Sequence, residues 1–154
     1  MYRNILVPID GSAMSTQGLR EAVALARQLH SRIQLLHVLD QTPWSASGLV
    51  PAVTNDLVVA LRQAGESILE RGRQEAAAAD LEVEARLVQV FGDRVGETVV
   101  NEAKGWPADL IVCGTHGRRG VRRLLLGSDA EYIVRLSPVP VLLVRTPELL
   151  TADG

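Results

Sequence analysis

Short apolar runs alternate with longer stretches of helical periodicity along the whole chain. Runs of consecutive Val, Leu and Ile are typical of strands that are buried on both faces, and they predict strands at residues 5–9, 32–38, 110–113 and 141–144. The run at 84–90 alternates apolar and polar residues, so we expect a strand near the sheet edge there. Apolar residues spaced three or four apart predict helices at 15–29, 55–79, 95–104 and 128–136.

The ends of these helices carry recognisable signals. Ser15 and Asn55 are plausible N-caps for the first two. Gly65 and Gly72 each weaken the second helix by about 1 kcal/mol relative to alanine, so we expect a kink or an early end. We assign its buried stripe to Leu57, Leu61, Ala64 and Ile68.

Alternating strands and helices predict a single α/β domain: an open parallel sheet with helices on both faces. We expect this domain at residues 1–146, followed by a flexible tail at 147–154. Ligands of such sheets bind beyond the carboxyl ends of the strands, where the strand order reverses. The first strand ends in Asp10-Gly11-Ser12 and the fourth in a glycine-rich loop. If these strands are neighbours, both loops border one crevice.

Composition removes several classes of function. The chain has 154 residues, of which 47% are hydrophobic, with a net charge of −2 and a single cysteine. The charge argues against a general nucleic-acid binder, and one cysteine excludes an internal disulfide framework. No apolar run reaches the roughly 18 residues that a membrane helix needs. Residues 2–5 lack a signal-peptide pattern, so we expect a cytoplasmic protein without a membrane segment.

The segment from Cys113 to Ser128, CGTHGRRGVRRLLLGS, has the features of a phosphate-binding loop. Glycines let backbone N–H groups approach an anion, and the helix that follows adds unpaired N–H donors and the positive end of its dipole. Neither GxxxxGK[ST] nor GxGxxG after the first strand is present, which excludes a Walker-type lysine loop and a dinucleotide fingerprint. Arginines are concentrated in this segment at Arg118, Arg119, Arg122 and Arg123.

The spacing Gly114-x2-Gly117-x9-Gly127-Ser128, with NILVPIDGS near the start and SPVPVLLVR near the end, resembles the ATP-binding branch of the universal stress protein family. The resemblance covers residues 3–145. It implies a Rossmann-like, five-stranded parallel sheet of order 3-2-1-4-5, with ATP, ADP or AMP in the crevice. It also implies a homodimer through the final strand, whose ends are Val139 and Arg145, and leaves open whether dimers form tetramers. An exposed apolar edge strand independently favours such pairing.

Carried over residue by residue, the resemblance implies a nucleotide site. Pro8, Ile9 and Val38 would line the adenine, and Asp10 would bond the ribose or adenine. The segment from Gly114 to Arg118 would wrap the ribose and phosphates, and Gly127 with Ser128 would hold the distal phosphates. The candidate site residues are Pro8, Ile9, Asp10, Val38, Gly114, Thr115, His116, Gly117, Arg118, Gly120, Gly127, Ser128 and Asp129.

Asp129 departs from the family pattern, which has a small or apolar residue after the Gly-Ser pair. A carboxylate stabilises the start of a helix by about 0.3–1 kcal/mol in a ligand-free protein. Beside a triphosphate it would repel, unless it bound Mg²⁺ and became favourable. The position therefore leaves the preferred phosphate length open.

Several candidate residues also have a purely structural interpretation. Asp10 either binds a ligand or caps its own turn. His116 either contacts phosphate or lies solvated in its loop, and Ser128 either donates to phosphate or caps a helix. Trp44, in a loop at 41–54 that we interpret as a surface lid, either stacks near the adenine or covers the core. Cys113 is expected to be a buried small residue, and His30 and His37 to be structural.

These features favour a nucleotide-responsive regulatory protein of the stress response with an unidentified protein partner. No catalytic residue or metal-ligand set stands out in the sequence. A slow Mg²⁺-dependent ATPase or phosphate-transfer enzyme is one alternative, with Asp129 as a metal ligand. A nucleotide-free dimeric adaptor is another, and the intact glycine motif speaks against it.

Overall fold

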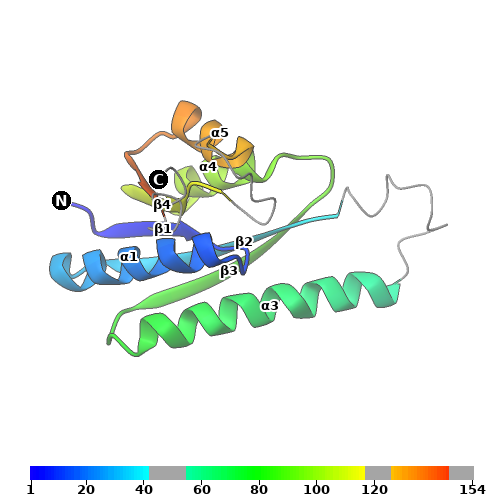
Figure 1. Cartoon of the computed structure of the whole chain (residues 1–154), viewed down its shortest axis with the longest axis horizontal. Helices are drawn as coiled ribbons and strands as arrows, with labels where there is room; N and C mark the ends of the chain where they lie inside the picture. The colour runs from blue at the N-terminus through cyan, green and yellow to red at the C-terminus, as the bar shows by residue number, and fades with distance from the viewer. Residues whose placement is uncertain (42–54, 117–125, 146–154) are drawn as a thin grey trace, which may run out of the picture.

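The computed structural model describes residues 1–41, 55–116 and 126–145 (Figure 1). Strands and helices alternate along the chain, as predicted. They are β1 (Asn4–Pro8), α1 (Ala13–Leu29), β2 (Arg32–Asp40), α3 (Asn55–Ala77), β3 (Val83–Val90), α4 (Val95–Gly105), β4 (Leu110–Gly114), α5 (Ser128–Leu136) and β5 (Val141–Val144).

The strands form one five-stranded sheet in the order β3-β2-β1-β4-β5, and all neighbouring strands are parallel. This confirms the expected fold class and strand order. β1 lies at the centre, with β2 on one side and β4 on the other. The chain therefore leaves the sheet centre in opposite directions after β1 and β4, which creates the reversal where ligands of open sheets bind. β3 lies at one edge, as the alternating pattern at 84–90 predicted.

Two apolar layers hold the helices on the sheet. Ile5 and Val7 of β1 face α1 and α3, while Leu6 between them faces α4 and α5. This alternation follows from the two-residue period of a strand, and all three side chains are fully buried. Figure 1 shows α4 and α5 together on one side of the sheet, with α3 on the other. Both faces of β1 are covered, as its uninterrupted apolar sequence predicted.

Helix α3 corrects two expectations from the sequence. It runs through Gly65 and Gly72 without the expected early end, because both glycines are buried against the sheet. A Cβ at position 65 would lie 2.7 Å from His37 Cδ2 and 2.8 Å from Leu87 Cδ1. The glycines therefore let the helix approach β2 and β3 closely. Ala64 was wrongly placed in the buried stripe and is exposed, since Gly65 occupies that face.

The start of α1 also differs from the expectation. The helix begins at Ala13, and its N-cap is Ser12, whose side chain accepts a hydrogen bond from the Ser15 N–H at 3.2 Å. Ser15 was therefore wrongly expected to be the N-cap. It is buried within the first turn, where its hydroxyl donates to the Ser12 carbonyl at 3.1 Å. Two serines three residues apart both carry the capping signal, and the turn at Asp10 selects the earlier one.

We expect Gly65→Val to lower the free energy of unfolding by about 2 kcal/mol, because the added carbons overlap His37, whose ring Nδ1 is 2.8 Å from the Ile9 carbonyl oxygen. Ala64→Val is the matched control. It lies one position along on the exposed face, so only helix propensity changes, by less than about 1 kcal/mol. Urea unfolding of both variants measures the two changes in the free energy of unfolding. If both variants lose the same amount, the close packing of α3 does not depend on glycine at position 65.

Candidate functional site

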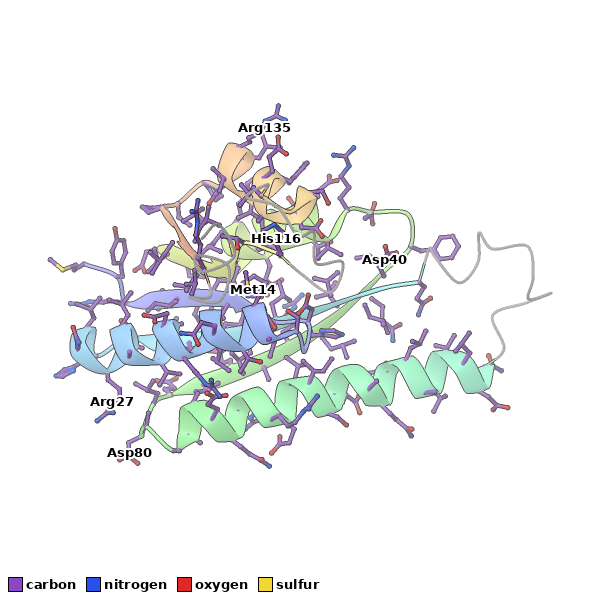
Figure 2. All side chains as sticks on the ribbon, in the orientation of Figure 1. Met14, Arg27, Asp40, Asp80, His116 and Arg135 are labelled. Atoms are coloured by element: carbon purple, nitrogen blue, oxygen red, sulfur yellow. The ribbon has the colours of Figure 1, made fainter. Side chains whose placement is uncertain are left out.

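The candidate site lies where β1 and β4 end side by side at the carboxyl edge of the sheet. Ile5 and Leu6 pair with Leu110 and Ile111, so both strands leave the sheet at the same level. Met14, at the start of α1, lies against Gly114 at the end of β4, and Figure 2 labels Met14 together with His116, which follows β4. The structure thus brings the Asp10 turn and the beginning of the glycine-rich segment to one edge, as predicted.

The turn after β1 is built by its own polar side chains. Asp10 Oδ1 accepts a hydrogen bond from the Ser12 N–H at 2.9 Å, and Ser15 Oγ accepts one from the Asp10 N–H at 3.3 Å. Gly11 adopts a φ of 81°, which favours glycine. The structural interpretation of Asp10 is therefore confirmed, and its bond to Ser12 fixes the carboxylate at the edge of the crevice. Its contact with a ligand stays a prediction.

Gly114 is packed tightly against α1. A Cβ at this position would lie 2.9 Å from the Met14 carbonyl oxygen, and a Cβ at Gly18 would lie 3.3 Å from the Gly114 nitrogen. The two glycines allow the first turns of α1 to rest directly on the end of β4. Gly114 therefore has a packing reason to be glycine, in addition to the expected approach of a ligand.

Thr115 joins three elements at the mouth of the expected crevice. Its N–H donates to the Val144 carbonyl of β5 at 3.1 Å, and its carbonyl accepts from the Gly127 N–H at 2.8 Å. Because Gly127 precedes α5, these bonds hold the end of β4, the start of α5 and the end of β5 together.

Some predicted residues lie outside the described part of the chain. They are the site residues Gly117, Arg118 and Gly120, and also Arg119, Arg122, Arg123 and Trp44.

His116 presents a buried ring nitrogen at this mouth. Its Nδ1 is 3.1 Å from the Thr115 hydroxyl oxygen, and its Nε2 is buried without a hydrogen-bond partner in the part of the chain that the structure describes. When the hydroxyl donates to Nδ1, the ring proton is on Nε2, which is then a donor. A buried donor favours a nearby acceptor, because leaving it unpaired costs about 1–3 kcal/mol.

The first turn of α5 begins at Ser128 without a side-chain cap. Gly127 is its N-cap residue, and its carbonyl accepts the first helical hydrogen bond from the Glu131 N–H at 2.9 Å. The backbone N–H groups of residues 128–130 therefore have no partner within the helix and lie at the positive end of its dipole. Ser128 itself is exposed among the described residues, and a helix start of this kind favours an anion.

Asp129 has a structural role that sequence reasoning missed. Its Oδ1 accepts a hydrogen bond from the Gly96 N–H at 3.0 Å, in the first turn of α4. The α4 N-cap residue, Arg94, makes no side-chain cap bond, so Asp129 supplies the cap from the neighbouring helix. The two residues are 33 positions apart, and no local pattern announces such a contact.

The residues expected to line an adenine do not share one face of the sheet. Ile9 packs with the core beneath α1 and α3, whereas Val38 packs with the core beneath α4 and α5. Pro8 ends β1 beside Leu36 and is half-buried. Only a ligand placed across the carboxyl edge of the sheet could contact both Ile9 and Val38.

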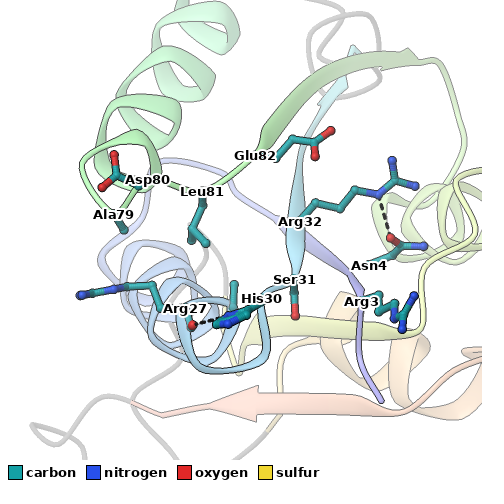
Figure 3. A pocket seen from close by; sticks show the side chains of 11 residues that line it. Arg3, Asn4, Arg27, His30, Ser31, Arg32, Ala79, Asp80, Leu81 and Glu82 are labelled. Atoms are coloured by element: carbon teal, nitrogen blue, oxygen red, sulfur yellow. Dashed lines mark hydrogen bonds between the residues drawn. The ribbon is translucent and has the colours of Figure 1, made fainter.

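Hollows border the sheet among the described residues. One of about 190 Å³ lies between α1 and α3, lined by Ile9, Gly11, Ser15, Thr16, Leu19, Ile68, Arg71, Gly72 and Glu75. A larger one of about 520 Å³ lies at the opposite edge, where Arg32 bonds Asn4 Oδ1 at 2.7 Å (Figure 3). α1 and α3 both end near this second hollow and carry the negative ends of their dipoles there. Its charged lining is mixed, with Arg3, Arg27 and Arg32 beside Asp80 and Glu82. Because ligands of open parallel sheets bind at the carboxyl ends of the strands and this hollow lies at the amino ends, we place the candidate site at the carboxyl edge.

Cys113 is confirmed as a buried small residue. It is 4% exposed in the core beneath α4 and α5, and burial raises the pKa of its thiol to about 12. The thiol therefore stays protonated at neutral pH and is unreactive.

Among residues 1–41, 55–116 and 126–145, no three His, Cys, Asp or Glu side chains group to hold a metal ion. No helix in these same ranges is long and apolar enough to span a membrane.

Comparison with known proteins identifies close relatives over almost the whole chain. The model of the universal stress protein family matches residues 1–145. Universal stress protein YxiE of Bacillus subtilis is 32% identical over 151 residues, covering 94% of this chain and 100% of the relative. Universal stress protein MJ0531 of Methanocaldococcus jannaschii is 30% identical over 149 residues, covering 96% of this chain and 85% of the relative.

Solved structures share the same fold. Hypothetical protein MJ0577 is 27% identical with a TM-score of 0.82, covering 95% of this chain and 97% of the other. A universal stress protein in complex with cAMP is 24% identical, with a TM-score of 0.68 and coverage of 94% and 98%. One from Archaeoglobus fulgidus in complex with dAMP is 21% identical, with a TM-score of 0.66 and coverage of 92% and 97%. At 24% and 21% identity, the likeness shows the fold.

We expect Gly114→Ala to lower the free energy of unfolding of the ligand-free protein by about 1–3 kcal/mol, because its Cβ would overlap the Met14 backbone, which has no side-chain freedom to yield. Gly105→Ala, at the end of α4, is the control, since no atom lies within 4 Å of its added Cβ. Thermal and urea unfolding report both. A Gly114→Ala protein as stable as the control would mean that α1 shifts freely on β4.

Proposed function

The chain belongs to the universal stress protein family, and on that premise we propose that it binds ATP or a related adenine nucleotide as a cytoplasmic, nucleotide-responsive regulatory protein of the stress response. One observation carries the proposal: the open start of α5 is fastened to the end of β4 by the Gly127–Thr115 hydrogen bond. This places unpaired N–H donors where the strand order reverses.

The phosphates would bind at the first turn of α5. Backbone N–H groups there, together with the Ser128 hydroxyl, provide donors at the positive end of the helix dipole. The buried Nε2 of His116 adds a donor from the opposite side, at the end of β4. Gly117, Arg118 and Gly120 would complete this part of the site.

The adenosine would lie across the carboxyl edge of β1 and β2. Asp10 would receive the ribose or adenine, because the Ser12 N–H already holds its carboxylate in place. Pro8, Ile9 and Val38 would contact the base from two faces of the sheet. The cAMP and dAMP bound by the two solved universal stress proteins agree with this ligand class.

A regulatory role fits the way Thr115 connects its neighbours. A nucleotide that orders the mouth of the crevice would act on β4, α5 and β5 at once, and β5 is an edge strand that a partner can reach. The contact of Asp129 with Gly96 gives that carboxylate a capping role and leaves Oδ2 as the oxygen that a slow ATPase would use for its metal ion. Release of phosphate from Mg²⁺·ATP over hours would instead favour the enzyme. A folded dimer that responds to no nucleotide would favour the adaptor.

Calorimetric titration with ATP, ADP and AMP tests the nucleotide site. We expect saturable binding, and we expect Ser128→Ala to weaken it about tenfold, since hydrogen bonds to charged groups contribute about 1.5–3 kcal/mol. Ser67→Ala is the matched control, because Ser67 is also exposed and helical but lies on α3, bonded to the Gln63 carbonyl. The proposal fails if the wild-type protein binds none of the three at millimolar concentration.

We further propose a homodimer through β5 and its flanking residues from Val139 to Arg145. The outer edge of β5 has no neighbouring strand in the described sheet, and Leu142 is 41% exposed on it. Val134 and Leu136 of the adjacent α5 are also exposed. Unpaired edges and exposed apolar side chains of this kind favour association between copies.

Leu142→Glu should convert the dimer to a monomer at micromolar concentration, because a charge on the edge opposes strand pairing. Val59→Glu serves as control, since Val59 is 53% exposed on α3, away from β5. Sedimentation equilibrium gives the mass of each. A wild-type monomer, or an unchanged dimer in Leu142→Glu, would contradict the assignment of this interface. The mass of the wild-type protein also shows whether dimers associate into tetramers.

A further inference from the structure

We propose that Asp129 sets the phosphate-length preference of the crevice: its fixed carboxylate opposes long, highly charged phosphate chains and so favours AMP-like nucleotides over free ATP. This inference rests on the proposed function, because it assumes that phosphates bind at the start of α5. It concerns a residue that departs from the family pattern and whose position the structure now defines.

The carboxylate of Asp129 is held where the first turns of α4 and α5 meet. It belongs to the residue directly after Ser128, and its Oδ1 accepts the Gly96 N–H at 3.0 Å. The two helices meet closely there, since a Cβ at position 96 would lie 2.9 Å from the Asp129 carbonyl oxygen and 3.0 Å from Tyr132 Cβ. The charge cannot turn away from the helix start without breaking the cap of α4.

Other charged side chains also lie near this helix start. Glu131 is a second acidic residue in the first turn of α5, and Arg94 is near Tyr132, with its guanidinium carbon 5.9 Å from the ring centroid. The negative charges of Asp129 and Glu131 partly cancel the positive potential at the start of α5, so this helix start attracts a phosphate less strongly. A triphosphate brings more negative charge to this turn than a monophosphate does, so it loses more binding energy there.

A role as a Mg²⁺ ligand is the competing interpretation of Asp129. The Gly96 N–H occupies Oδ1 and leaves Oδ2 for a cation. Mg²⁺ bound to a nucleotide keeps several waters and takes one or two carboxylates beside the phosphate oxygens, so this single oxygen is enough for a metal-ligand role. Repulsion and metal binding therefore predict opposite effects on Mg²⁺·ATP binding when the charge of Asp129 is removed.

Two substitutions separate charge from capping. Asp129→Asn keeps an oxygen that accepts from the Gly96 N–H and removes the charge, whereas Asp129→Ala removes both. Asp80→Asn is the control, because Asp80 is exposed at the opposite edge of the sheet, where Figure 2 labels it. Dissociation constants for ATP and AMP are measured by calorimetry in EDTA and in Mg²⁺, at low and high salt, alongside thermal unfolding of each ligand-free protein.

In EDTA at low salt, Asp129→Asn should tighten ATP binding about two- to fivefold, which is the factor that a charge at a helix terminus contributes, with a smaller change for AMP. High salt should reduce this gain, because the carboxylate is exposed. Asp129→Ala should unfold at a lower temperature than Asp129→Asn, because it also loses the cap.

An ATP-to-AMP affinity ratio that is the same in wild type and Asp129→Asn would overturn the inference while leaving the nucleotide site intact. Weaker binding of Mg²⁺·ATP by Asp129→Asn would also overturn it, in favour of the metal-ligand role. If the wild-type protein binds neither nucleotide, the proposed function fails and this inference fails with it. The two failures are therefore distinguished by the wild-type titration alone.

Discussion

The hydrogen bond from the Gly127 N–H to the Thr115 carbonyl, at 2.8 Å, is the contact on which the candidate site depends. It returns the chain to the end of β4 after the glycine-rich segment, so that α5 begins at the reversal of strand order. The Thr115 N–H, bonded to Val144, ties the same point to β5. A buried threonine with both backbone groups engaged therefore fixes the position of the helix start, and the electrostatics of that start follow from the fixed position.

Close packing at glycine explains much of how the helices sit on this sheet. Gly18 and Gly114 let α1 rest on β4, and Gly65 lets α3 rest on His37 and Leu87. Gly96 lets the first turns of α4 and α5 meet. With aromatic residues at only 3% of the chain, the core is built from Val, Leu, Ile and Ala, and short distances between elements replace large side chains. Glycine in this protein is thus a packing residue as well as a loop residue.

Asp129 shows how a single side chain can belong to two structural units. It stands in the first turn of α5, yet its carboxylate caps α4, so the two helices share one anion between their starts. The start of α4 is thereby filled from within the protein, while the start of α5 has no side-chain cap. This asymmetry distinguishes two otherwise similar helix N-termini on the same side of the sheet.

The sequence by itself determined the element order, the parallel sheet and its edge at β3, because strand and helix periodicities and turn residues are local properties. It also predicted that Asp10, Gly114 and the Gly127-Ser128 pair border one binding crevice. The structure brings the Asp10 turn, the end of β4 and the start of α5 to one edge of the sheet, and ligand binding there stays a prediction. The burial of Gly65 and Gly72 and the contact between Asp129 and Gly96 were decided only by the tertiary structure. Each depends on a backbone or side chain that lies opposite the residue in space, and periodicity carries no record of what lies opposite.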